Sequence, residues 1–183
     1  MEDRDTRYSL RGLIELDDTY IGGKNKSGKR GRGARSKVPV LVAVETLPEG
    51  CGHVALSKVP SVSSDQARPF VDEKIQNDAF ILSDSLSTSR SLSKERNICP
   101  LTIWEGHRAV EIFPDVHRVI ARLKNWIRGT HGHVSDKHLN RYLAEFGYRF
   151  NRRFKQRRET IFDRLVTACC NTRTITYRQL VHG

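Results

Sequence analysis

The run from Val38 to Glu45 constrains this chain more than any other segment. Its letters, VPVLVAVE, are apolar at successive positions up to the final acid. Because neighbouring side chains of a strand point to opposite faces, such a run predicts a strand that is buried on both sides. A strand of that kind needs other elements packed on each face of its sheet, so the chain is expected to form a layered domain. Its 183 residues are enough for one domain of ordinary size.

The remaining periodic segments predict both strands and helices. Strands are expected at residues 12–21, 38–45, 52–59 and 79–82, with a hairpin turn at 48–52. Helices are expected at residues 63–76, 115–129, 135–154 and 160–170. Between them, residues 86–105 are expected to hold a short serine-rich helix and a short strand near 101–104. This order predicts an α/β fold with a mixed sheet flanked by helices and a helical C-terminal part. It fits a ribonuclease H-like fold, although several other α/β folds would accommodate it.

The chain carries a large excess of positive charge. Lys and Arg number 32 against 21 Asp and Glu, which gives a formal net charge of +11. Such an excess favours a polyanionic partner, most simply nucleic acid, although solubility alone would also explain it. The candidate phosphate contacts lie in a Gly-rich basic segment and in a second run that could equally complement a helix dipole. They are Lys24, Lys26, Lys29, Arg30, Arg32, Arg35 and Lys37, followed by Arg152 and Arg153.

Cysteine usage and hydropathy indicate an intracellular setting. The four cysteines form no C-x-x-C pair, so we expect reduced thiols and no zinc site. No apolar stretch approaches the roughly 20 residues needed to span a bilayer. The first ten residues are charged where a secretory signal would be apolar. We therefore expect a cytoplasmic, nucleoid-associated protein without a membrane partner.

Two aspartates are candidates for a metal site. In the strand at 12–21, Asp17 falls on the face opposite the apolar side chains of Ile14 and Leu16, so it is expected on an open face. Asp84 follows the strand at 79–82, where open α/β sheets place ligand-binding groups. Each also has a plainer explanation, as a solvated strand residue or as a turn and cap residue. Together they could hold Mg²⁺ or Mn²⁺ for phosphoryl transfer.

Three segments of the chain resemble the ISXO-like insertion-sequence transposases of the DDE superfamily. They are ELDDTYIGGK from Glu15, GKRGRGARSKVPVLVAVE from Gly28, and the long segment from Phe113 to Phe154. The resemblance implies a ribonuclease H-like catalytic domain at 12–158, preceded by an extension at 1–11 and followed by a C-terminal helix and tail at 159–183. The zinc-ribbon and helix-turn-helix region that usually precedes this domain is expected to be absent, because the chain begins 16 residues before Asp17 and has no zinc-ribbon cysteines.

The resemblance also assigns roles to individual positions. It places the catalytic, metal-binding aspartates at Asp17 and Asp84, and a phosphate-contacting lysine at Lys124. Its third metal-site position falls on Arg122, which has no lone pair for a metal and would repel one. Replacing Arg122 by Asn is therefore expected to strengthen metal binding. His117 also matches the family and could orient a phosphate or cap its helix.

The activity implied by the resemblance is metal-dependent cleavage and strand transfer of DNA. The expected partners are double-stranded DNA, at transposon ends and at the target, and further copies of the chain assembled on that DNA. Because Arg122 departs from the pattern, and because Asp84 lies in Ser83-Asp84-Ser85-Leu86 rather than Thr-Asp-Gly-Trp, a catalytically inactive DNA-binding remnant remains the alternative. A ribonuclease or junction resolvase of the same fold is a third interpretation.

Overall fold

The computed structural model describes residues 8–22, 37–84, 97–101, 109–153, 158–172 and 174–182. The chain divides into two compact units, Met1–Asn151 and Arg152–Gly183. Across the described segments, we find no helix with the length and apolar character to cross a membrane.

The first unit is built on one mixed sheet of five strands. They are β1 (Leu13–Ile21), β2 (Val38–Leu47), β3 (Gly50–Lys58), β4 (Phe80–Asp84) and β5 (Ile98–Leu101). The spatial order is β3-β2-β1-β4-β5. Strands β1, β2 and β3 pair antiparallel, whereas β4 runs parallel to both β1 and β5. This mixed sheet with flanking helices confirms the predicted ribonuclease H-like α/β class.

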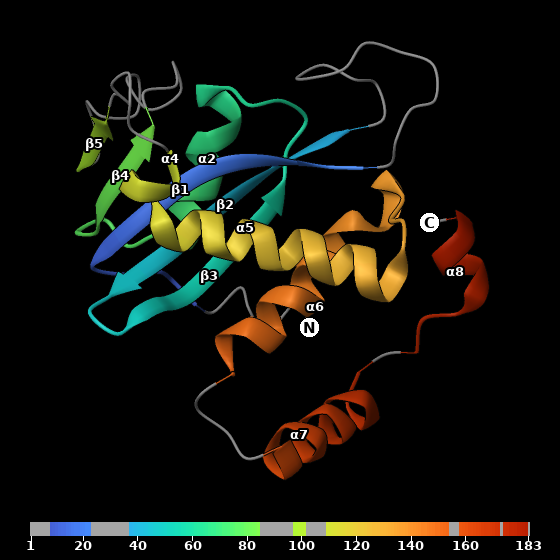
Figure 1. The fold of residues 1–183 in the computed structure, drawn as a ribbon. Coiled ribbons are helices and arrows are strands. Elements are labelled where there is room, and N and C mark those ends of the chain that lie inside the picture. The colour runs from blue at the N-terminus through green and yellow to red at the C-terminus, as the bar shows by residue number, and fades with distance from the viewer. Residues whose placement is uncertain are drawn as a thin grey trace. The chain divides into compact units, whose positions relative to one another are not determined.

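Helices cover both faces of the sheet, as the run in β2 requires. Helix α2 (Ser64–Lys74) lies behind the strands in Figure 1, and α5 (Pro114–Trp126) crosses in front of them. The β2 side chains divide between the two cores. Val40, Val42 and Val44 pack with α5 and α6 (Leu139–Asn151), while Leu41 and Ala43 pack with α2. Both sets are buried, so the prediction of a two-sided strand is confirmed.

Several element boundaries differ from the predicted ones because tertiary pairing sets them. The strand expected near 101–104 is β5, three residues earlier, since pairing with β4 sets Ile98 beside Ile81. Helix α5 does not end at Gly129 but continues as a π-helical turn, Ile127–His131. Ser135 precedes a short 3₁₀ turn, Asp136–His138, rather than capping α6 directly. Helix α4 (Ala109–Ile112) was not predicted, and the expected serine-rich helix falls outside the described residues.

The outer edge of β3 is closed by the last residue of α6. The Val54 N–H donates to Oδ1 of Asn151 at 2.7 Å, and Nδ2 of Asn151 donates back to the Val54 carbonyl at 3.0 Å. Asn151 is buried, so its amide takes the place of a neighbouring strand. An edge covered in this way is protected from pairing with another chain.

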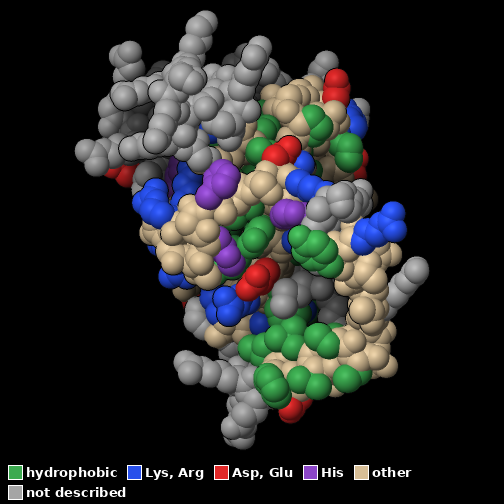
Figure 2. All heavy atoms as spheres, turned by 90° about the vertical axis from the view of Figure 1, so that its right-hand side faces the viewer, with side chains coloured by type: hydrophobic (Ala, Val, Ile, Leu, Met, Phe, Trp, Pro, Cys, Tyr) green, Lys and Arg blue, Asp and Glu red, His purple; other side chains and the backbone are tan. Residues whose placement is uncertain are grey.

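The second unit contains α7 (Arg158–Cys170) and α8 (Tyr177–His182). Helix α7 exposes Phe162 and Val166, and hydrophobic side chains are visible along it at the bottom of Figure 2. The boundaries 1–11, 12–158 and 159–183 remain a prediction.

Candidate metal and DNA site on strand β1

The two candidate aspartates belong to neighbouring strands. Strand β1 runs parallel to β4, with Leu16 paired to Ser83. One residue further along each strand lie Asp17 and Asp84, so their main chains come side by side at the carboxyl end of β4. Neighbouring strands are about 4.8 Å apart. The side chain of Asp84 lies outside the described part of the structure.

The Asp17 carboxylate faces helix α5. Its side chain is 16% exposed, and its Oδ1 accepts the N–H of Asp18 at 2.7 Å. The other oxygen, Oδ2, lies 3.8 Å from Nδ1 of His117. The face that was predicted to be open is therefore covered by a helix, and Glu15 and Thr19 on either side of Asp17 are buried.

One flank of α5 brings basic groups to Asp17. His117 and Lys124 are seven residues apart, so they lie on the same side of the helix. Lys124 is half-buried, and burial lowers its pKa. The negative charge of Asp17 raises that pKa, and the positive charge of Lys37 lowers it. Lys37, which directly precedes β2 at the end of the basic segment, therefore lies near this cluster. The sequence-predicted residues Asp17, Lys124 and Lys37 are brought together.

Arg122 lies on the other flank of α5. Its position is about 140° around the helix from His117. Arg118, four residues earlier on the Arg122 flank, places Nη1 3.6 Å from Sγ of Cys51 in β3. The Arg122 guanidinium carbon is 5.9 Å from the ring centroid of Phe150 in α6. Both contacts point toward β3 and α6, whereas Asp17 lies on β1. The structure does not bring Arg122 to Asp17.

Asp115, which the sequence offers as another acid on the same helix, is also turned away. It is buried, and Arg118 donates to its Oδ1 at 2.7 Å. The Cys51 thiol lies 3.2 Å from the same oxygen. This local network holds Asp115 near β3, on the flank away from Asp17.

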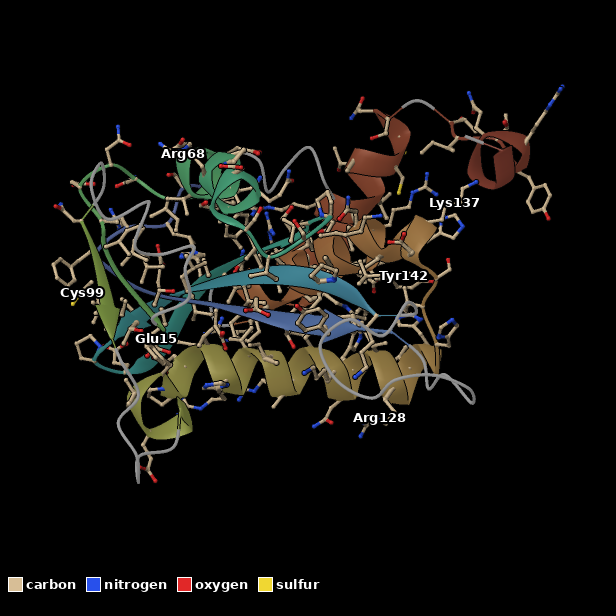
Figure 3. All side chains as sticks on the ribbon, turned by 90° about the horizontal axis from the view of Figure 1, so that it is seen from above. Glu15, Arg68, Cys99, Arg128, Lys137 and Tyr142 are labelled. Carbon is tan, nitrogen blue, oxygen red and sulfur yellow. The ribbon has the colours of Figure 1, made fainter. Side chains whose placement is uncertain are left out.

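A buried acid on β1 fixes the start of α5. The N-cap residue of α5 is Phe113, whose side chain cannot accept a hydrogen bond from the first turn of the helix. Instead Oε2 of Glu15 accepts the N–H groups of Asp115 and Val116 at 2.9 and 2.8 Å. Burial raises the pKa of Glu15, while the bond from the Val116 N–H opposes that rise. In Figure 3, Glu15 lies near the start of α5 and Arg128 near the far end.

Sequence reasoning missed the role of Glu15. Strand alternation set it on the same face as Asp17 but gave no sign that a helix about 100 residues later would use its carboxylate. The one signal available was an acid within an apolar strand, and that pattern alone does not identify a partner.

The other predicted DNA contacts are less fully described. Lys24, Lys26, Lys29, Arg30, Arg32 and Arg35 lie outside the described residues. Lys37 is exposed, Arg152 is buried and Arg153 is half-buried. Their contacts with phosphate remain a prediction. Among the side chains that the structure describes, no three of the types His, Cys, Asp and Glu gather as a metal site.

Comparison with known proteins identifies the family. The family model of the ISXO2-like transposase domain matches residues 9–151. No curated protein matches the chain. A solved structure titled "Crystal structure of a pre-cleavage Mos1 transpososome" is 14% identical, with a TM-score of 0.35, and the match covers 82% of this chain and 58% of that one. The chain thus spans less than two thirds of that structure's chain. Since this match covers more than half of the 183 residues, the chain belongs to the ISXO2-like transposase domain family.

Proposed function

We propose that this chain is a transposase catalytic domain that cleaves and transfers DNA strands with the help of a divalent metal ion. The observation that carries the proposal is the half-buried Asp17 carboxylate, which lies beside the end of β4 and beneath basic groups of α5. An acid that is directed at cations on a neighbouring helix is suited to share a metal ion and a phosphate with them.

The donor chemistry fits a divalent ion. Oδ2 of Asp17 is turned toward α5, because Oδ1 is held by the Asp18 N–H. Asp17 and Asp84 would hold Mg²⁺ or Mn²⁺, which supplies charge stabilisation at a phosphoryl oxygen and a lower pKa for bound water. No more than one or two carboxylates are needed, since Mg²⁺ keeps several waters and takes phosphate oxygens as further ligands.

The basic residues position the DNA in this proposal. Lys124, half-buried above Asp17, contacts a phosphate next to the bond that is cleaved. Lys37 and the basic segment at 24–36 follow the backbone, since Lys and Arg bind phosphates without reading sequence. The substrates are double-stranded DNA at transposon ends and at the target, and copies of the chain assemble on them.

The test is nicking of supercoiled plasmid DNA with Mg²⁺ or Mn²⁺, comparing wild type with Asp17→Asn. We expect metal-dependent nicking that Asp17→Asn reduces at least about 100-fold, because removing a ligand charge weakens metal and transition-state binding. Asp136→Asn is the matched control, since Asp136 is exposed on the 3₁₀ turn and pairs with Lys58. Equal nicking by wild type and Asp17→Asn would refute the proposed site. Plasmid binding without nicking by the wild type, with either metal, would establish the inactive remnant instead.

A further inference from the structure

We infer that Arg128 and Gly129, in the π-helical turn that follows α5, form a contact for the DNA backbone beyond the candidate metal site. This inference deepens the proposed function and rests on it. It concerns which residues position the duplex at a distance from Asp17.

Arg128 continues the flank of α5 that carries Lys124. The two residues are four apart in a continuous helical backbone, so their side chains lie on the same side, one turn from each other. Lys124 is half-buried near Asp17 and Lys37, whereas Arg128 is exposed. The flank therefore leads from the buried acid out to solvent, and Figure 3 shows Arg128 at the far end of α5.

The Arg128 guanidinium is free to bind an anion. Within the described part of the chain, it forms no ion pair with an acidic side chain. Arg118 and Arg149, in contrast, pair with Asp115 at 2.7 Å and with Glu145 at 3.6 Å. Because arginine binds phosphate through charge-assisted hydrogen bonds, an exposed arginine without such a pair is suited to a phosphate.

Gly129 leaves room for another backbone to approach. It is exposed within the turn Ile127–His131, and its φ lies outside the left-handed region. A Cβ added to Gly129 would meet no atom within 4 Å. Neither its conformation nor the packing of the described residues therefore requires glycine, although glycine makes a helix less stable than alanine does. A glycine that the fold does not require is typical of a site where a ligand comes close to the main chain.

The spacing along α5 suits a duplex that reaches Asp17. His117 lies beside Asp17, and Arg128 is about 16 Å further along the axis, at about 1.5 Å per residue. Phosphates of one strand follow each other at about 3.4 Å along the duplex, so Arg128 contacts a phosphate about five nucleotides from Asp17. Lys37, near Lys124, brings the end of the basic segment to the same flank.

The experiment measures the affinity of the full chain for a short DNA duplex by fluorescence anisotropy, in EDTA and over a range of salt concentrations. Wild type is compared with Arg128→Gln and with the control Arg149→Gln, which loses the same charge from an exposed arginine that is paired. Each phosphate contact adds about 0.9 to the slope of log affinity against log salt. We expect Arg128→Gln to lower that slope by about 0.9, and the affinity about eightfold at about 0.1 M salt. The control should stay close to wild type.

Gly129→Ala separates DNA binding from folding. Alanine favours a helix over glycine, so the urea midpoint of unfolding should rise. The added methyl group blocks the approach of the phosphate backbone, so duplex binding should weaken at least about threefold. A variant that damages the fold would instead lower the midpoint.

Equal salt slopes for Arg128→Gln and Arg149→Gln, or wild-type affinity in Gly129→Ala, overturns the inference. A lowered urea midpoint in Gly129→Ala would show that the fold requires this glycine, and would overturn its assigned role. Because the binding assay contains no divalent metal, these results leave the metal site to the nicking assay with Asp17→Asn. A wild type that does not bind the duplex would contradict the proposed function itself.

Discussion

Replacing Glu15 tests how α5 is held over the candidate site. Glu15→Ala removes a buried carboxylate that accepts two backbone N–H groups, at 2.9 and 2.8 Å. A hydrogen bond to a charged acceptor contributes about 1.5–3 kcal/mol, so the two bonds set a gross loss of about 3–6 kcal/mol. Removing the carboxylate also relieves its desolvation, which is the main reason that its pKa is raised. We therefore expect a net destabilisation of about 2–4 kcal/mol.

Glu15→Gln is the matched variant, because its amide oxygen can accept the same two N–H groups without a charge. It should cost about 1 kcal/mol or less. The two variants differ in whether an acceptor remains, so urea unfolding followed by circular dichroism separates the acceptor from the charge. Equal destabilisation by Glu15→Ala and Glu15→Gln would refute the claim that Glu15 acts as the helix cap.

The pH dependence gives the sign of the charge effect. The pKa of Glu15 is raised by burial in the fold, from an ordinary value of 4.5. The unfolded chain therefore loses this proton at a lower pH than the folded chain does. As pH rises above 4.5, the folded state is destabilised relative to the unfolded state. The stability of wild type relative to Glu15→Gln should fall as pH rises above 4.5. A constant difference across that range would contradict the raised pKa.

Three further predictions concern other contacts of the first unit. Asn151→Ala should destabilise the fold by about 2–4 kcal/mol in urea unfolding, because the Val54 N–H and carbonyl lose their buried partner. The control Asn140→Ala removes a 3.4 Å contact at an exposed position and should cost under about 0.5 kcal/mol. Glu45 has a lowered pKa because hydrogen bonds from His53 and the Arg11 N–H outweigh the effect of burial. The stability of wild type relative to Glu45→Gln should therefore fall as pH drops below 4.5. A stability difference that instead grows in acid would contradict the lowered pKa. Lys124→Met should tighten Mn²⁺ binding roughly threefold in calorimetry, because it removes a cation near Asp17, and it should weaken plasmid binding. Unchanged affinities for both Mn²⁺ and plasmid would exclude Lys124 from the site.

The strands and the long helices could be predicted because each carries its own periodicity. The stripe of Val116, Val119, Ile120 and Leu123 is buried as expected. Asp17 was predicted on one strand and Asp84 just after another, and the structure extends that second strand, β4, to Asp84. The pairing of Leu16 with Ser83 sets the two strands side by side. Local patterns of this kind depend on residues near one another in the chain.

The remaining features depend on pairings between distant segments. A helical stripe shows which face of α5 is buried, but not which flank points to β1 and which to β3. That direction follows from the contacts of Arg118 and Arg122, so the orientation of position 122 could not be read from the resemblance. The hydrogen bonds from α5 to Glu15 join residues about 100 positions apart, and such a pairing produces no periodic pattern in the sequence.

The most direct test of the account is anomalous diffraction from crystals of the chain soaked in Mn²⁺. The account predicts a manganese peak within about 2.3 Å of Oδ2 of Asp17, with Asp84 among its ligands. A manganese ion bound elsewhere, with none in contact with Asp17, would contradict the central claim that this strand carries the reaction's metal site.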